Sequence, residues 1–402
     1  MAEWNNTHLS EVLVDKGYIR GPFGSALKRC DMKDNGIPVY EQQHAIYNSR
    51  YFRYYIDEQK FNEMKRFQVN TDDLIISCSG TVGKVSIIRS DDPKGIISQA
   101  LLILRVDQKK ILPLYLKYFF TSRDGYNAIV SRSSGSVQVN IAKRNVIEQI
   151  PLMLPKIEIQ RKIVEILNSI DNKIEENEEI NNNLEQQAQA IYHERFETVS
   201  PNDLPSDWRI VTLGEVATIS NKSFNPLKEP EILLEHYSIP AFDEVRFPVF
   251  ELSTSIKSNK FIIDASCFMI SKLNPTTKRV WKPYCLTGNA VCSTEFIVYK
   301  AKDKTITDFL YSVIDSNSFS DFMCSHVTGS TGSRQRTTPS DTLSYELILP
   351  SEDELAEFQS LVSPMYAQIR INAIENDRLK RLRDSLLPKL MSGEIDVSTI
   401  QL

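Results

Sequence analysis

Four basic side chains fall within two short stretches of the sequence. "TTKRVW" at residues 276–281 contains two of them, and "GSRQRT" at residues 332–337 contains the others. The four are Lys278, Arg279, Arg334 and Arg336. Residues 198–350 as a whole carry 15 Lys+Arg against 17 Asp+Glu, a net charge of -2. Clustered cations in an acidic segment indicate a surface that docks phosphate groups, rather than one that only keeps the protein in solution.

Motifs for catalysis are missing where the residue types suggest them. A methyltransferase acting on base amino groups needs Asn/Asp-Pro-Pro-aromatic, but "NPTT" at 274–277 lacks the second Pro and the aromatic residue. "DEQK" at 57–60 has only part of a nuclease metal motif, and no Walker loop occurs. The five histidines show no paired spacing. We therefore expect no catalytic residues in this chain.

The cysteines also predict no special chemistry. The six are dispersed, with no CxxC pair and no His at ligand spacing, which argues against zinc and against a disulfide framework. They are Cys30, Cys78, Cys267, Cys285, Cys292 and Cys324. We expect no metal site and no bound cofactor in the chain.

Length and composition predict a globular protein of two or more domains. The chain has 402 residues, of which 41% are apolar and 25% charged. No run approaches eighteen apolar residues, and the N-terminus lacks the basic-then-apolar order of a signal peptide. The expected location is cytoplasmic, with no membrane partner.

A long helix is predicted after Pro155. Apolar and Asn residues recur at alternating spacings of three and four for more than four heptads, although "SIDNKIEENEEINNN" at 169–183 is polar. The seam is Ile163, Leu167, Ile170, Ile174, Asn177, Asn181, Leu184, Ala188 and Ile191. A helix of about 42 residues would be roughly 60 Å long. It cannot bury such a seam alone, so it needs a partner of similar length.

The partner helix lies in the same chain, at residues 352–392. Its predicted seam is Leu355, Phe358, Leu361, Met365, Ile369, Asn372, Leu379, Leu382 and Leu386. A shift of 195 residues superimposes the two helices. Antiparallel packing would place the polar centres opposite each other. Buried Asn residues fix register at some cost in stability, so we predict this role for Asn177, Asn181, Gln368 and Asn372. Alternatively, these side chains face solvent or another subunit.

The repeat continues outside the helices. "WNNTHLSEV" at 4–12 matches "WRIVTLGEV" at 208–216. Shorter echoes pair "IPVYEQ" at 37 with "IPAFDE" at 239, "LIISCSGTVGKV" at 74 with "FMISKLNPTTKRV" at 268, "SQALLILRV" at 98 with "STEFIVYKA" at 293, and "SGSVQVN" at 134 with "TGSRQRT" at 331. One unit of about 200 residues is therefore used twice, each a strand-rich block followed by a long helix.

Charge is distributed unevenly between these segments. Residues 1–155 carry 21 Lys+Arg against 16 Asp+Glu, a net charge of +5, whereas residues 156–197 carry 5 against 10. A basic block beside an acidic helix fits a polyanion partner, although a charge of +5 is also common in proteins that bind none.

This organisation resembles the DNA specificity subunit of Type I restriction-modification systems. The stretches that carry the resemblance are "GPFGSALK" at 21–28, "SGSVQVNI" at 134–141, "IPLMLPKIEIQRKIVEIL" at 150–167, "ISKLNPTTKRVW" at 270–281 and "LKRLRDSLLPKLMSGEI" at 379–395. The first block departs from the pattern with "SCSGTVGKV" where the second has "SKLNP", and the second helix lacks the usual "EQ" after its Pro.

The resemblance implies an α+β fold: two globular target recognition domains joined by two long helices in an antiparallel coiled coil, with an internal pseudo-twofold repeat. The implied boundaries are 1–154, 155–197, 198–349 and 350–402. Each recognition domain would read one half of a split, asymmetric site on double-stranded DNA, about one turn or roughly 34 Å apart. Partners would be two methyltransferase subunits and, through the complex, restriction/translocase subunits. These partners would carry S-adenosylmethionine, ATP and Mg, and this chain would be non-catalytic.

Candidate DNA contacts are polar and basic residues on Gly/Ser/Asn-rich loops of each block. In the first block they are Ser25, Lys28, Ser79, Thr81, Lys84, Ser136, Gln138, Asn140 and Lys143. In the second they are Lys272, Asn274, Thr276, Lys278, Arg279, Arg334, Gln335 and Arg336. Gln and Asn pair with adenine edges, Arg with guanine, and Lys mostly with phosphate.

Other interpretations remain open from the sequence. The aromatic stretch "YFRYYIDEQKF" at 51–61 would either pack on a sugar-phosphate edge or form a half-buried strand. The whole chain could instead be an enzyme with a small substrate, or a coiled-coil adaptor that binds no DNA. An enzyme requires a convergent acid/base or metal set, and an adaptor leaves the two divergent blocks unexplained.

Overall fold

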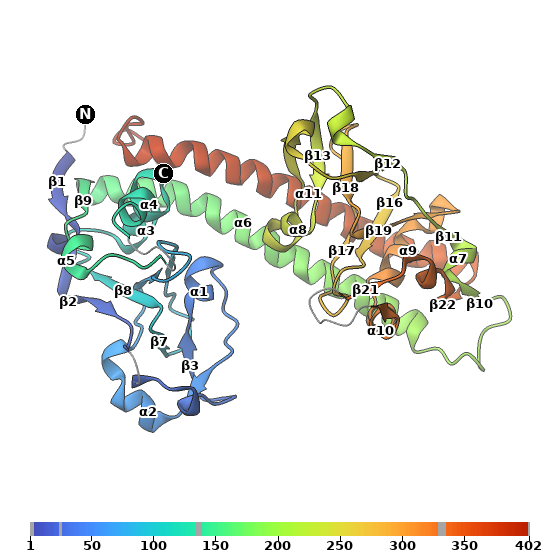
Figure 1. The fold of residues 1–402 in the computed structure, drawn as a ribbon, viewed down its shortest axis with the longest axis horizontal. Helices are drawn as coiled ribbons and strands as arrows, with labels where there is room; N and C mark the ends of the chain where they lie inside the picture. Colours follow the sequence, from blue (N-terminus) through green and yellow to red (C-terminus); the bar gives the residue numbers. More distant parts are fainter. Residues whose placement is uncertain (1–3, 24–25, 134–138, 329–334, 401–402) are drawn as a thin grey trace. The chain divides into compact units, whose positions relative to one another are not determined.

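The computed structural model describes residues 4–23, 26–133, 139–328 and 335–400. Packing divides the chain into two compact units. Unit 1 comprises residues 1–173 and 379–402, and unit 2 comprises residues 174–378. Each unit therefore contains one globular block and part of both long helices (Figure 1).

Two long helices confirm the predicted class. Helix α6 spans Ile157–Tyr192 and helix α11 spans Glu352–Met391. In unit 1, Ile163 near the start of α6 shares a core with Leu390 near the end of α11. In unit 2, Tyr192 at the end of α6 contacts Phe358 near the start of α11, with ring centroids 6.3 Å apart. The helices are therefore antiparallel, as the duplicated pattern predicts.

The predicted seam of the second helix is wrong at two positions. Leu361 and Leu382 are 40% and 47% exposed, whereas Val362 and Tyr366 are buried. Val362 and Tyr366 follow Phe358 at spacings of four, and Tyr366 packs edge-on against Tyr311 of the globular block at 4.9 Å. The helix has two neighbours, the other helix and the block, so its apolar stripe is wider than a heptad seam.

Unit 1 is built on a four-stranded antiparallel sheet. Its order is β2 (Leu13–Arg20), β8 (Leu101–Val106), β5 (Leu74–Ser77) and β6 (Val85–Ile87). A three-stranded sheet comprises β4 (Tyr55–Ile56), β3 (Ile37–Tyr40) and β7 (Ile96–Ile97), and β1 (Trp4–His8) pairs with β9 (Pro151–Pro155). The helices are α1 (Gln42–Ile46), α2 (Glu58–Glu63), α3 (Pro113–Thr121), α4 (Arg123–Val130) and α5 (Arg144–Ile147).

Unit 2 has a similar element order. Its four-stranded sheet is β11 (Ala217–Ile219), β19 (Phe296–Ala301), β16 (Cys267–Ser271) and β17 (Val280–Trp281). A five-stranded sheet comprises β12 (Ser223–Phe224), β15 (Lys260–Ile262), β18 (Ala290–Ser293), β13 (Leu233–Tyr237) and β14 (Val249–Leu252). Strands β10 (Arg209–Thr212) and β22 (Glu346–Leu349) pair, as do β20 (Val327–Thr328) and β21 (Arg336–Thr337). The helices are α7 (Leu213–Val216), α8 (Ile239–Val245), α9 (Thr307–Ile314) and α10 (Asn317–Ser325).

Comparison of the units corrects one sequence echo. The echoes at 74/268 and 98/293 fall on β5/β16 and β8/β19, which form the same antiparallel pair in each unit. The echo of "IPVYEQ" with "IPAFDE" is wrong, because Ile37 lies in β3 while Ile239 begins α8. The counterpart of β3 is β13, since each pairs in parallel with one neighbour, β7 or β18.

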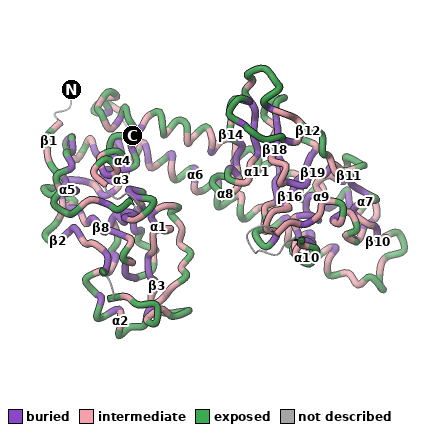
Figure 2. The backbone as a smooth tube through the Cα atoms, in the orientation of Figure 1, coloured by how far each residue is buried: buried purple, intermediate pink, exposed green. Residues whose placement is uncertain are grey.

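The cores lie inside these sheets and along the facing stripes of the long helices. Figure 2 shows buried backbone concentrated in the strands, with exposed segments at turns and on the outer helix faces. The short apolar run "LLILRV" in β8 is buried at every position except the Arg, as a strand covered on both faces requires. Among the residues described, no helix combines the length and the apolar content needed to cross a lipid bilayer.

Candidate nucleic-acid interface

In the first block, two distant candidates meet at the end of β5. Ser79 forms a β-bridge with Asn140, and the Ser79 hydroxyl donates to Asn140 Oδ1 at 2.6 Å. On either side, the Ile141 amide donates to the Cys78 carbonyl at 2.9 Å and the Gly80 amide donates to the Val139 carbonyl at 2.8 Å. This ladder joins the 79–84 loop to residues 139–141.

The second block contains the same ladder at the end of β16. Leu273 forms a β-bridge with Arg336. The Thr337 amide donates to the Lys272 carbonyl at 3.1 Å, and the Asn274 amide donates to the Gln335 carbonyl at 2.9 Å. The predicted candidates 272, 274, 335 and 336 therefore lie together.

The backbone after each bridge shows how two different loop sequences form the same turn. Gly80 and Asn274 occupy equivalent positions, and both have left-handed backbone, with φ of +68° and +49°. Glycine adopts this conformation freely, and Asn tolerates it better than most other residues. "SCSG" and "SKLN" are thus two sequence solutions to one turn geometry.

The remaining described candidates of the first block are exposed. Thr81 and Lys84 follow Gly80 on the same loop, and the Lys84 ammonium lies 5.1 Å from the centroid of the Tyr126 ring. Lys143 caps α5, two residues after the ladder, and Lys28 precedes a short 3-10 helix. Lys143 lies three positions after Asn140, which is part of the ladder. No contact among the described residues links Lys28 to the ladder.

Sequence reasoning missed one residue at this site. Gln42, the first residue of α1, accepts a hydrogen bond at Oε1 from the Ser79 amide at 3.1 Å. It ties α1 to the 79–84 loop across 37 residues of sequence. Only the polar run Glu41-Gln42-Gln43 after the buried strand β3 would have signalled it.

Arg279 and Arg336 of the second block form ion pairs within unit 2. Arg279 makes two hydrogen bonds to the Asp243 carboxylate, at 2.6 and 2.9 Å, and its side chain is only 12% exposed. Arg336 makes two bonds of 3.0 Å to Glu295, with 42% of its side chain exposed. These carboxylates compensate the local positive charge that the sequence predicts, and Arg336 is the more accessible of the two guanidinium groups.

Lys278 also pairs with a carboxylate. Its ammonium lies 3.1 Å from Asp315 Oδ1. Burial raises the pKa of the Asp315 carboxyl, and the charge of Lys278 opposes that rise. Thr276 is exposed on the same loop and Lys272 is half-buried. The other candidates, Ser25, Ser136, Gln138 and Arg334, lie outside the described residues.

The polar centre of the helix pair is built from Asn side chains. Asn177 Nδ2 donates to Glu375 Oε2 and to Asn376 Oδ1, both at 2.8 Å. Asn372 Nδ2 donates to Asn181 Oδ1 at 2.9 Å. Asn177, Asn372 and Asn376 are 1%, 4% and 5% exposed. Buried amides of this kind require partners, and each of these three side chains has one within the helix pair.

Two details of this centre differ from the sequence expectation. Gln368 is exposed, and its Nε2 donates to Asn372 Oδ1 at 2.7 Å within α11. Asn376, which the heptad pattern did not select, also donates to the Ile174 carbonyl at 3.2 Å. The register role of these residues stays a prediction.

The thiols and carboxylates of the described residues bear on metal binding and nucleophilic chemistry. Within the described part of the chain, no cluster of three or more His, Cys, Asp or Glu residues is arranged to hold a metal ion. The six cysteines are free, and burial raises the pKa of the Cys78 thiol to about 12. Thiols of this kind are poor nucleophiles near neutral pH because the thiolate is scarce.

Comparisons with known proteins agree with this architecture. The family described as Type I restriction modification DNA specificity domain matches residues 2–186. The Type I restriction enzyme MjaIX specificity subunit of Methanocaldococcus jannaschii is 24% identical over 315 residues, covering 71% of this chain and 70% of that protein. The HindI specificity subunit of Haemophilus influenzae is 21% identical over 403 residues, covering 78% and 84%.

A solved structure shares the fold. The crystal structure of the Type-I restriction-modification system S subunit from M. genitalium matches with a TM-score of 0.58 at 14% identity. The match covers 97% of this chain and 96% of that one.

Proposed function

We propose that this chain is a specificity subunit of a Type I restriction-modification system and that its two blocks read two different halves of one split site on double-stranded DNA. The family match over residues 2–186 and the similarity to the MjaIX and HindI specificity subunits support this proposal. Methyl transfer and ATP hydrolysis then belong to partner methyltransferase and restriction/translocase subunits. These partners carry S-adenosylmethionine, ATP and Mg, and this chain supplies recognition only.

One observation carries the proposal: both blocks build the same ladder and display different side chains on it. Ser79 and Asn140 occupy the bridge in the first block, and Leu273 and Arg336 occupy it in the second. A shared scaffold with exchanged polar groups suits two readers of unlike base sequences, since Asn pairs best with adenine edges and Arg with guanine. A catalytic role for this chain would instead require acids, bases or metal ligands that converge on one substrate.

The long helices set the distance between half-sites in this proposal and dock two methyltransferase subunits. Helix α6 has 36 residues and helix α11 has 40, which correspond to about 54 and 60 Å. The hydrogen-bonded Asn centre supports a single alignment of the helices, and a ruler needs one alignment.

The test is to exchange residues 1–154 for the equivalent block of a related specificity subunit and to sequence the methylated sites in the host. We expect one half of the methylated motif to change, while the other half and the spacing persist. A change in both halves would refute independent recognition, and an unchanged motif would exclude the first block from base reading.

The spacing is tested by adding seven residues to α6 and seven to α11 at facing positions. A heptad preserves the seam and lengthens each helix by about 10.5 Å, or about three base pairs. We expect the non-specific spacer of the methylated motif to grow by that amount. If methylation persists with the original spacer, the helices do not set the distance.

A further inference from the structure

Two tyrosine rings of the first block face solvent, whereas the neighbouring Phe52 ring is partly buried. Tyr47 is 76% exposed and Tyr51 is 71% exposed. Phe52 instead packs inward, stacked on the His44 ring with centroids 4.6 Å apart. We call residues 47–53 the aromatic loop. Exposed rings are common on flexible loops, but the contacts of this loop restrict its motion.

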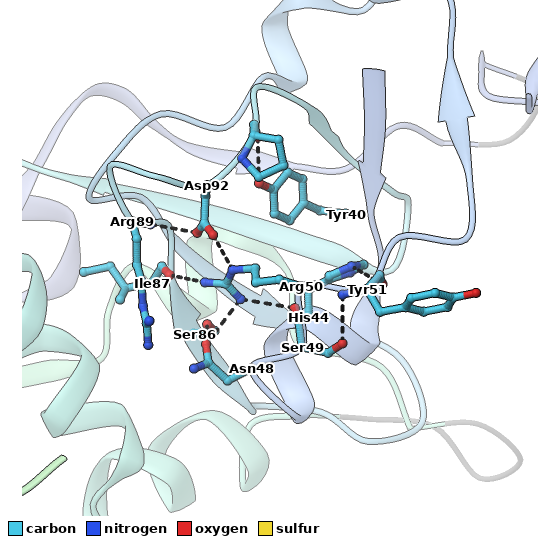
Figure 3. A network of polar contacts seen from close by, with 11 residues as sticks. Tyr40, His44, Asn48, Ser49, Arg50, Tyr51, Ser86, Ile87, Arg89 and Asp92 are labelled. Carbon is cyan, nitrogen blue, oxygen red and sulfur yellow. Dashed lines mark hydrogen bonds and ion pairs between the residues drawn. The ribbon is translucent and has the colours of Figure 1, made fainter. Parts of the chain in front are cut away.

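Arg50 anchors the aromatic loop to the rest of the block (Figure 3). Its Nε donates to Asp92 Oδ1 at 2.5 Å, and its Nη2 donates to the Ile87 carbonyl at 2.9 Å. Asp92 is itself held, since its other oxygen accepts from the Arg89 amide at 2.8 Å. A planar guanidinium with several acceptors in fixed directions restricts the loop far more than one ion pair does.

Two further contacts hold residues of the aromatic loop, and a third fixes the His44 ring that makes one of them. Asn48 has left-handed backbone, with φ of +52°, and its Oδ1 accepts from the Ser86 hydroxyl at 2.6 Å. The Tyr51 carbonyl accepts from His44 Nε2 at 3.1 Å, while His44 Nδ1 accepts from the Glu41 amide at 2.7 Å. A non-glycine residue keeps such backbone only where its surroundings hold it.

The rings are thus presented on a rigid support. Figure 3 shows the Tyr51 ring pointing away from the Arg50 network, toward the outside of the block. Rigid aromatic side chains lose little conformational entropy on binding, which is why they serve as contact residues in recognition surfaces.

The aromatic loop is continuous with the candidate interface. Helix α1 begins at Gln42, which binds the Ser79 amide, and ends at Ile46, directly before Tyr47. Five residues of helix therefore connect the ladder to the first exposed ring. The block that carries both has a net charge of +5, which favours a polyanionic partner.

We propose that Tyr47 and Tyr51 contact the DNA backbone beside the half-site read by the first block. Each ring packs on deoxyribose, and each phenol hydroxyl donates a hydrogen bond to a phosphate oxygen. Tyr is among the residues that contact phosphate and sugar, and such contacts position a protein on the duplex without reading sequence. This inference rests on the proposed function.

The experiment measures duplex binding by the full chain assembled with its methyltransferase subunits, using fluorescence anisotropy across a salt series. The double variant Tyr47→Phe/Tyr51→Phe removes only the two hydroxyl groups. We expect it to weaken binding about tenfold. The loss should be equal for the cognate site and a scrambled duplex, and the salt slope should not change because no cation is removed. Tyr47→Ala/Tyr51→Ala should weaken binding further.

Two more variants separate a contact from a general effect. Arg50→Lys keeps the charge but loses the planar fork, so binding should weaken as the rings lose their support. Met153→Ala removes an exposed apolar side chain of unit 1, on β9, and should leave affinity unchanged.

The outcomes distinguish this inference from the proposed function. Unchanged affinity of both tyrosine double variants, with specific binding by the parent complex, overturns the inference alone. Loss of assembly with the methyltransferase subunits also overturns it, because the rings would then dock protein. A parent complex that does not distinguish cognate from scrambled DNA overturns the proposed function itself.

Discussion

Replacing Asn177 with leucine removes the donor of two hydrogen bonds at the centre of the helix pair. The Asn376 amide oxygen and the Glu375 carboxylate each lose a partner at 2.8 Å. Asn376 is 5% exposed, so its oxygen cannot easily recruit water. The replacement also gains burial of an apolar side chain, and the two effects must be weighed.

The magnitudes favour a net loss for each single variant. A neutral hydrogen bond contributes about 1 kcal/mol, one to a charged group about 1.5–3, and a stranded buried acceptor costs about 1–3. Burying leucine offsets about 1.5–3 kcal/mol of this. We expect Asn177→Leu and Asn376→Leu each to destabilise the helix pair by about 1–2 kcal/mol. In the double variant neither buried side-chain amide remains without its partner, so the stability of the helix pair should lie within about 1 kcal/mol of the parent. The two substitutions would then be coupled by about 2–3 kcal/mol.

Native-state hydrogen exchange is the suitable assay, because a chain of two units need not unfold in one step. Protection of the amides of residues 174–184 reports the local free energy in all four members of the cycle. Asn182→Leu, at an exposed position of the same helix, should change it by less than about 0.5 kcal/mol. Light scattering should reveal misaligned or oligomeric species in the double variant. Additive single effects would refute the reasoning.

Three other outcomes are expected. Burial lowers the pKa of His44 below 6.5, so the folded protein disfavours its protonation. Below about pH 6.5 the unfolded chain binds the proton more readily, and stability should fall by up to about 1.4 kcal/mol per pH unit until the folded pKa is passed. Urea midpoints of the parent and His44→Gln across this range check it, and equal slopes would contradict it. When DNA binding is measured across a salt series, Arg336→Gln should lower the slope of log affinity against log salt concentration by about one. Arg279→Gln should lower the slope less, because that guanidinium is mostly buried. The reverse order would be evidence against this assignment. Gly393 has φ of +75°, and an added Cβ would lie 2.9 Å from Trp4 ring atoms. Gly393→Ala should therefore destabilise unit 1 by about 1–3 kcal/mol, as measured by thermal unfolding. No change would mean that the segment around residue 393 can shift to make room.

The elements that depend on local pattern could be predicted from the sequence. The heptad spacing in residues 160–191 predicts α6, because a helix places residues three and four apart on one face whatever lies elsewhere in the chain. The duplication predicts its antiparallel partner, α11. The β-branched runs in "DDLIISCSG" and "KVSIIRSDD", joined by a Gly-containing loop, predict two strands, and these form β5 and β6.

The neighbours of each polar side chain were decided only by the tertiary structure. Ser79 and Asn140 are 61 residues apart, and Asn177 and Asn376 are 199 apart. From the sequence, Arg279 is one of several cations in an acidic block, but in the fold its guanidinium forms an ion pair with the Asp243 carboxylate. Periodicity reports which face of an element is buried, because burial depends on the element's own geometry. Partner choice depends on packing between elements, and single-residue shifts of register exchange one partner for another.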